Sequence, residues 1–121
     1  AVLASWTDAI EPDSPTEAAA IRRIRSYGLD APVTQHEVFD EEGRFVARLD
    51  MAWPDQLVGR EYVSARWHRP DKIEDDELRL QRLEELGWSV ENLYRYQLQP
   101  NEVEWLHQLR RALAVGRPMS A

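Results

Sequence analysis

Two acidic residues, Asp50 and Glu61, stand on either side of a short turn segment, where their carboxylates could meet. Asp50 lies near the end of one expected strand and Glu61 lies inside the next, and residues 53–56 between them have the composition of a tight turn. If the strands pair as a hairpin, the two residues lie about equally far from the turn and approach each other across the ladder. Because like charges repel, this arrangement favours a divalent cation between them. Mg²⁺ (or Mn²⁺) suits such oxygen ligands, and it can activate a water molecule for attack on a phosphodiester.

The same pair of acids also has a simpler interpretation. Asp50 could accept hydrogen bonds from turn amides while Glu61 faces solvent on an ordinary alternating strand. The spacing of two acids does not by itself decide between a cation site and this structural role.

The elements that would position these residues follow from hydrophobic periodicity and turn chemistry. Helical spacing of apolar residues predicts helices over residues 15–27, 71–86 and 100–115, and Gly28 and Gly87 are placed to end the first two. Extended patterns predict strands over residues 33–39, 45–52, 57–63 and 88–93. The order α-β-β-β-α-β-α predicts an α/β fold (an α+β mixed sheet) with four strands flanked by helices. A strand, a helix and a further strand in one sheet usually form a right-handed parallel connection.

The composition limits the class of protein. With 121 residues, 43% of them hydrophobic, we expect a lead-in over residues 1–13, one domain over residues 14–116 and a tail over residues 117–121. The chain has no cysteine, which excludes disulfides, thiolate zinc sites and cysteine nucleophiles. We find no long apolar run and no secretory signal pattern, so we expect a cytoplasmic protein without a membrane partner.

The net charge of −7 argues against nucleic-acid binding through bulk attraction. A local basic segment could still hold a DNA backbone: Arg60, Arg66, His68 and Arg69 lie between two acidic stretches, and Trp67 among them is a candidate for base stacking. In the simpler interpretation these charges are solvated surface, and the tryptophans pack in the core or at its rim.

A longer string of residues resembles one protein family. Residues 48–54, 58–62, 67–68 and 86–88, together with residues 14–17, are similar in order to the very-short-patch-repair-like endonucleases, over roughly residues 14–113. The resemblance implies a restriction-endonuclease-like core of the PD-(D/E)XK superfamily. The element order predicted from periodicity agrees with that core.

The resemblance also implies roles for particular residues of this chain. Asp50 and Glu61 would bind the metal ion, Glu17 would add an acid from the first helix, and His68 would lie near the scissile phosphate. Arg79, with Asp76 before it on the second helix, would orient the site.

The chain departs from the family at a position that the chemistry needs. The family usually has an Asp two residues after the Glu, where this chain has Val63, and a valine can neither bind a metal ion nor position water. Three explanations stay open: a member that no longer cuts, an active enzyme in which Glu17 and His68 compensate, or a different strand register. Arg60 also replaces an apolar residue, although on an edge strand it could extend outward.

These observations leave three functions open. The first is a metal-dependent DNA endonuclease or nickase weakened by Val63, acting as a homodimer or with a fused or partner DNA-binding domain. The second is a degenerate nuclease-fold module that binds nucleic acid or a protein partner in a toxin–antitoxin or phage-defence system. The third is a plain interaction domain that uses the acidic helix at residues 71–85 and the last helix.

Overall fold

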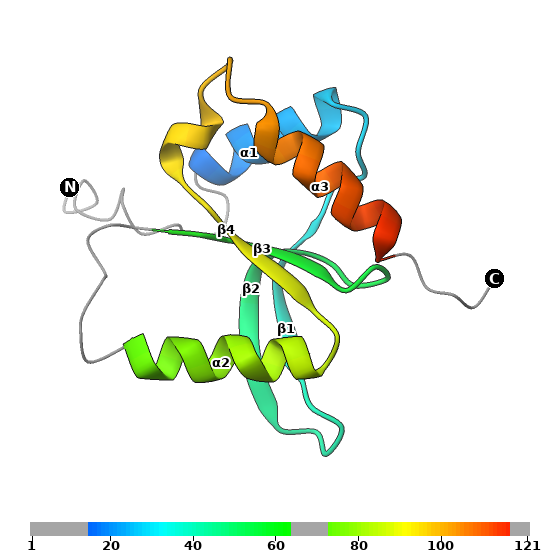
Figure 1. Ribbon diagram of the computed structural model, residues 1–121. Coiled ribbons are helices and arrows are strands. Elements are labelled where there is room, and N and C mark those ends of the chain that lie inside the picture. Colours follow the sequence, from blue (N-terminus) through cyan, green and yellow to red (C-terminus); the bar gives the residue numbers. More distant parts are fainter. Residues whose placement is uncertain (1–14, 64–72, 117–121) are drawn as a thin grey trace.

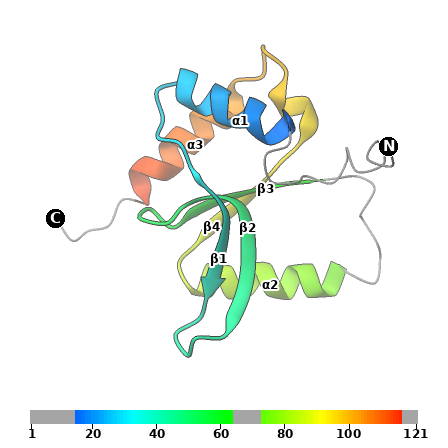
Figure 2. The ribbon, with the colours of Figure 1, turned by 180° about the vertical axis from the view of Figure 1, so that it is seen from behind.

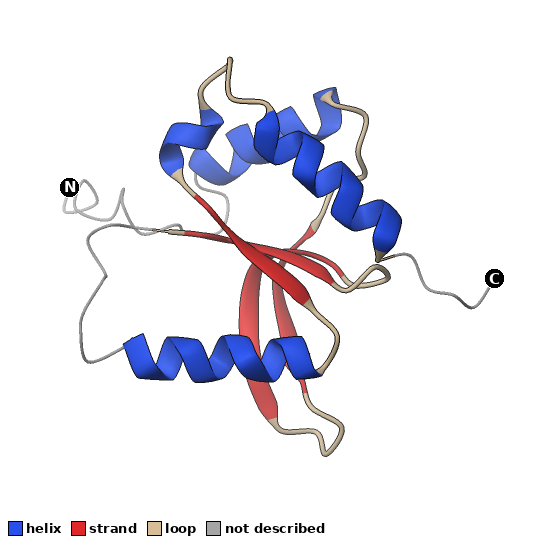
Figure 3. Ribbon diagram, in the orientation of Figure 1, coloured by secondary structure: helices blue, strands red, loops and turns tan. Residues whose placement is uncertain are grey.

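The computed structural model describes residues 15–63 and 73–116, which form a four-stranded sheet with helices on both faces (Figures 1 and 3). The elements are α1 (Pro15–Ser26), β1 (Val33–Phe39), β2 (Phe45–Trp53), β3 (Val58–Tyr62), α2 (Ile73–Glu85), β4 (Ser89–Leu93), the short 3-10 helix η4 (Arg95–Leu98) and α3 (Glu104–Val115). The predicted fold class and the order α-β-β-β-α-β-α are confirmed. The domain limits at residues 14 and 116 stay predictions.

The sheet has the strand order β1-β2-β3-β4. β1 with β2 and β2 with β3 are antiparallel pairs joined by short turns, and β4 returns parallel to β3 after α2. The predicted parallel connection is therefore present. β3 lies between two strands, so the expectation that Arg60 extends from an edge strand is wrong, and this side chain is only 3% exposed.

The two faces of the sheet bury separate clusters of apolar side chains. The α1–α3 core lies beneath helices α1 and α3 and consists of Ala20, Ile24, Met51, Trp53, Val58, Leu93, Trp105, Leu106 and Leu109. The α2 core lies on the other side and consists of Val38, Val46, Ala47, Leu49, Ala52, Leu83 and Trp88. Figure 2 shows from behind that helices α1 and α3 lie on one side of the sheet and helix α2 on the other. The expectation that tryptophans pack in the core is confirmed for Trp53, Trp88 and Trp105.

Glycines end the first two helices as predicted. Gly28 has φ +87° and Gly87 has φ +94°, a left-handed conformation that glycine adopts without a Cβ clash. The amide after each glycine bonds back into the helix, from Leu29 to the Ile24 carbonyl and from Trp88 to the Leu83 carbonyl.

The predicted start of the second helix at residue 71 lies outside the described residues, and the last helix begins at Glu104 rather than near residue 100. No helix in the described part of the chain is long and apolar enough to cross a membrane.

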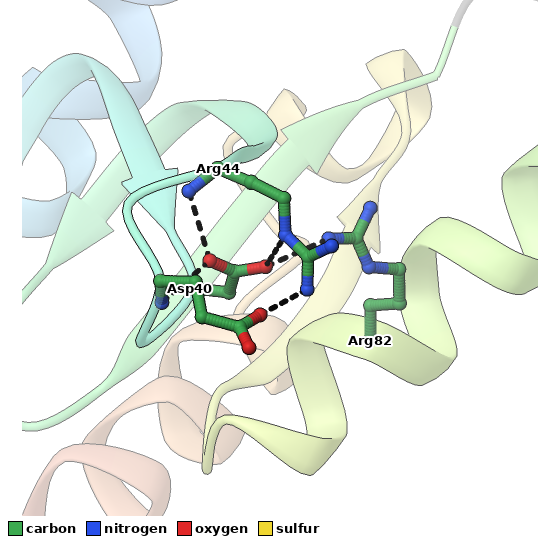
Figure 4. A network of polar contacts seen from close by, with 4 residues as sticks. Asp40, Arg44 and Arg82 are labelled. Carbon is green, nitrogen blue, oxygen red and sulfur yellow. Dashed lines mark hydrogen bonds and ion pairs between the residues drawn. The ribbon is translucent and has the colours of Figure 1, made fainter.

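A carboxylate joins the β1–β2 turn to helix α2 (Figure 4). Asp40 Oδ1 accepts the backbone N–H groups of Glu42 and Arg44 at 2.9 and 2.8 Å. Its Oδ2 accepts Arg44 Nε at 3.0 Å and Arg82 Nη2 at 3.3 Å. These donors, led by the Arg44 backbone N–H, hold the pKa of Asp40 below its ordinary value.

Replacing Asp40 with asparagine should lower the thermal midpoint of unfolding at pH 7 by a few degrees, because an amide accepts these hydrogen bonds less strongly than a carboxylate. The lowered native pKa means that the carboxylate stabilises the fold above its ordinary pKa of 3.8 and loses this effect as the pH falls through the native pKa. Circular dichroism melts of wild type and Asp40→Asn should therefore converge in acid. Asp55→Asn, in the exposed next turn, is the control. A difference that stays constant with pH would contradict the assigned role.

Candidate functional site

Asp50 and Glu61 come together at the end of the β2–β3 ladder. The ladder pairs Trp53 with Val58 and ends with the pair formed by Met51 and Arg60, so Asp50 and Glu61 occupy the next level. The strands thus pair in the expected register. At this level the Tyr62 N–H donates to Asp50 Oδ2 at 2.9 Å, so a side chain takes over from the backbone ladder. Burial raises the pKa of Glu61, and the negative charge of Asp50 adds to this effect.

Burial shapes the protonation of both acids. Burial raises the pKa of Asp50, against the lowering effects of the Tyr62 N–H, the Gln35 amide, Arg79 and Arg48. Burial is also the largest cause of the raised pKa of Glu61. The simpler interpretation is met in part, because Asp50 accepts a backbone N–H, although from β3 rather than from the turn. Glu61 does not face open solvent, since its side chain is 18% exposed and engaged by an arginine.

Arg79, on α2, is the charged partner of Glu61. Its Nη2 donates to Glu61 Oε2 in a hydrogen-bonded ion pair, and both side chains are largely sheltered from solvent. The guanidinium lowers the pKa of Glu61, while Asp76 one turn earlier on α2 raises it. A cation of the protein therefore already neutralises part of the charge that the two carboxylates bring together.

Glu17, the third predicted acid, lies on α1, which covers the opposite face of the sheet from α2. Glu17 is only 3% exposed in the first turn of the helix. Burial, Glu17 and Asp50 all raise the pKa of the Tyr62 phenol, so both carboxylates lie within electrostatic range of the same ring. Across residues 15–63 and 73–116, no three His, Asp or Glu side chains gather closely enough to hold an ion on their own. Of the three predicted acids, Asp50 and Glu61 are the two that the strand register places at the same level of the sheet.

Val63 follows Glu61 by two residues and lines the same groove. Its N–H donates to the Leu93 carbonyl at 3.0 Å, which continues the pairing of β3 with β4. Val63, Glu61 and Arg79 line one open groove of about 590 Å³, which extends to Leu80 and to Tyr94. Val63 thus presents an apolar side chain to this groove beside Glu61, whereas Asp50 is not among the residues that line it.

The structure describes only one of the four residues predicted to contact nucleic acid, Arg60. Arg60 is buried, and its Nη1 donates to the carbonyl of the neighbouring Gly59 at 2.7 Å, so in this structure the side chain is not presented to a ligand at the surface. Arg66, Trp67, His68 and Arg69 lie outside the described residues. Their assigned roles stay predictions.

Gln35 belongs to the site but was missed by sequence reasoning. The β1–β2 register pairs Thr34 with Met51 and His36 with Leu49, which sets Gln35 opposite Asp50. Its amide lowers the pKa of Asp50. A glutamine in a half-exposed strand gives no functional signal by itself. Gln35 lies opposite Asp50 because of the register between β1 and β2, which the sequence did not predict.

Comparison with known proteins finds a match to part of two longer chains. The uncharacterized protein MT2308 and the uncharacterized protein Rv2248, from the CDC 1551 / Oshkosh and H37Rv strains of Mycobacterium tuberculosis, are each 34% identical to this chain over 79 residues. The match covers 64% of this chain and 29% of each relative. No protein-family model matches the chain, and no solved structure matches it significantly.

Replacing Arg79 with glutamine should raise the pKa of Glu61 further, because both the positive charge and the hydrogen bond of the guanidinium lower it. The variant should consequently lose stability, relative to wild type, as the pH rises through the raised native pKa and an unpaired buried carboxylate forms. Carbon-13 NMR titration of the side-chain carboxyls measures the shift, with Glu61→Gln to assign the resonance. Arg82→Gln, one turn along α2, should leave Glu61 unchanged. An unaltered titration in the Arg79 variant would show that the ion pair does not form in solution.

Proposed function

We propose that this domain is a metal-dependent endonuclease or nickase that hydrolyses DNA phosphodiester bonds and is weakened by Val63. We further propose that its sheet is the restriction-endonuclease-like core of the very-short-patch-repair-like endonucleases. The observation that carries the proposal is the meeting of two sheltered carboxylates, Asp50 and Glu61, at the end of the β2–β3 ladder. Glu61 also lines an open groove in which a ligand could lie against its carboxylate.

The donor set fits a hard divalent cation. Mg²⁺ (or Mn²⁺) prefers oxygen ligands and keeps several waters, so one or two carboxylates are enough to hold it. The raised pKa values of Asp50 and Glu61 mean that the ionised pair is unfavourable in the folded protein, and a cation between them would relieve that cost. When bound, such an ion would polarise the phosphate and lower the pKa of an attacking water.

The residues of the chain would prepare the site for this ion. The Tyr62 N–H orients Asp50 by holding Oδ2. Arg79 orients Glu61, and it could turn to the negative charge of a phosphate once an ion takes its place beside the carboxylate. Glu17 keeps negative potential at this end of the sheet.

The partners in this proposal are DNA and either a second copy of the chain or a DNA-binding domain, fused or separate. A chain with a net charge of −7 has little general attraction for DNA, so affinity has to come from a few local cations or from another domain. The absence of cysteine agrees with a cytoplasmic protein, which we retain as part of the proposal.

A specific observation favours the second candidate, a degenerate nuclease-fold module that binds nucleic acid or a protein partner in a toxin–antitoxin or defence system. The Arg79 guanidinium already sits on Glu61, where a metal ion would bind, and Val63 supplies no ligand. A guanidinium that replaces the ion would keep the fold stable without supporting hydrolysis.

Plasmid nicking with Mg²⁺ or Mn²⁺, together with calorimetric titration of Mn²⁺, separates the candidates. If the domain is an enzyme, wild type should nick DNA, and Asp50→Asn should lose both nicking and most of the Mn²⁺ affinity, typically at a cost of orders of magnitude in rate. Asp55→Asn is the matched control and should behave as wild type.

The outcome for Val63→Asp decides between an active and a degenerate domain. If only this variant nicks DNA, the site is a degenerate one that a single carboxylate restores. If wild type binds no Mn²⁺ and ignores DNA even at low salt, both nuclease-derived functions are wrong and an interaction domain remains.

A further inference from the structure

Gln35 has a backbone conformation that needs an explanation. It lies inside β1, yet its φ is +52°, in the left-handed region. This conformation costs free energy for any residue with a Cβ, and it is uncommon outside glycine, asparagine and aspartate. Residues held in this way persist where the surrounding structure determines them, and they concentrate at functional sites.

The strained residue lies at the level of the carboxylate pair. Thr34 pairs with Met51 and His36 with Leu49, so Gln35 faces Asp50 from the neighbouring strand. On the other side of β2, the Tyr62 N–H of β3 already holds Asp50 Oδ2. Asp50 is thus flanked by polar groups from both adjacent strands.

The Gln35 amide also lacks a complete set of hydrogen bonds. Its Nε2 atom is buried and meets no acceptor in good hydrogen-bond geometry among the residues that the structure describes. A glutamine amide carries two N–H donors, and a buried donor without an acceptor costs free energy. The Gln35 amide acts on the Asp50 carboxylate, whose pKa it lowers, so an oxygen atom that binds beside Asp50 would lie where this donor can use it.

We propose that Gln35 is a positioning residue of the Asp50–Glu61 site, whose amide fixes the orientation of Asp50 and donates to oxygen atoms that bind next to it. The inference rests on the proposed function, because it assigns Gln35 to the same site. The left-handed backbone turns the amide onto Asp50, which is why a residue other than glycine stands at a position that would suit glycine better.

The first test needs no metal ion. Gln35→Gly removes the amide and adopts the left-handed backbone without a Cβ clash, so the strand should keep its conformation. If Gln35 positions Asp50, the Tyr62 N–H bond to Asp50 should loosen, and the Tyr62 amide should exchange with solvent several-fold faster than in wild type. Gln35→Asn tolerates the left-handed backbone but is too short to reach Asp50, and it should loosen Tyr62 in the same way.

Leu57→Gly is the matched control for the release of strain. Leu57 is the other residue besides glycine with positive φ among those that the structure describes, at +58° in the β2–β3 turn and away from Asp50. The Leu57→Gly variant should leave the exchange of the Tyr62 amide unchanged or make it slower. If Gln35→Gly and Gln35→Asn also leave Tyr62 unchanged or slower, Gln35 does not position Asp50 and the proposal is overturned.

The second test measures Mn²⁺ binding by calorimetry. Loss of an orienting neighbour typically weakens metal binding by about tenfold or more, so both Gln35 variants should show a dissociation constant raised by that factor, and Leu57→Gly should not. Unchanged affinity in the variants would overturn the role of Gln35 toward the ligand. If wild type itself binds no Mn²⁺, the proposed function fails, while the exchange rate of the Tyr62 amide still decides whether Gln35 positions Asp50.

Discussion

The structure depends on holding two acidic side chains close together where water only partly reaches them. Burial raises the pKa of both Asp50 and Glu61, so the folded chain bears a cost for keeping them ionised at neutral pH. Three kinds of group offset that cost: a backbone N–H from Tyr62, the amide of Gln35 and the guanidinium of Arg79. Each comes from a different element, so β1, β3 and α2 must all be in place before the acids can be buried.

The two acids lie at the point where β2 changes which side of the sheet its apolar residues face. Ala47 and Leu49 pack in the α2 core, whereas Met51 and Trp53 pack in the α1–α3 core. Because alternate residues of a regular strand share a face, β2 switches sides between Leu49 and Met51, at Asp50. Gln35, the left-handed residue of β1, lies at the same level. The sheet is therefore irregular at the site, and the hydrogen bond from the Tyr62 N–H to Asp50 follows the backbone ladder that ends there.

The sequence predicted most of the fold because local signals were strong and agreed with one another. Gly28 and Gly87 marked two helix ends, and the apolar residues of β1 to β4 marked strands within one or two residues of their limits. The approach of Asp50 to Glu61 followed from the turn between them. What failed depended on long-range packing, because β3 is an internal strand and Arg60 is buried there. Arg79 was expected at the site only through the resemblance, and neither its ion pair with Glu61 nor the strain at Gln35 has a local signature. The need for glycine at position 59 also could not be predicted from the sequence. A Cβ there would lie 2.8 Å from Leu49 Cδ1 of the adjacent strand, and this contact depends on the fold.

We propose that Asp50 and Glu61 form one site for a divalent cation and that Arg79 holds Glu61 when no ion is bound. Anomalous diffraction from crystals of the wild-type protein soaked in Mn²⁺ would locate the ion. We expect one strong anomalous peak bonded to carboxylate oxygens of both Asp50 and Glu61, with the Arg79 guanidinium displaced from Glu61. A map without a peak at this position, in which Arg79 still holds Glu61, would show that the two acids are not a cation site.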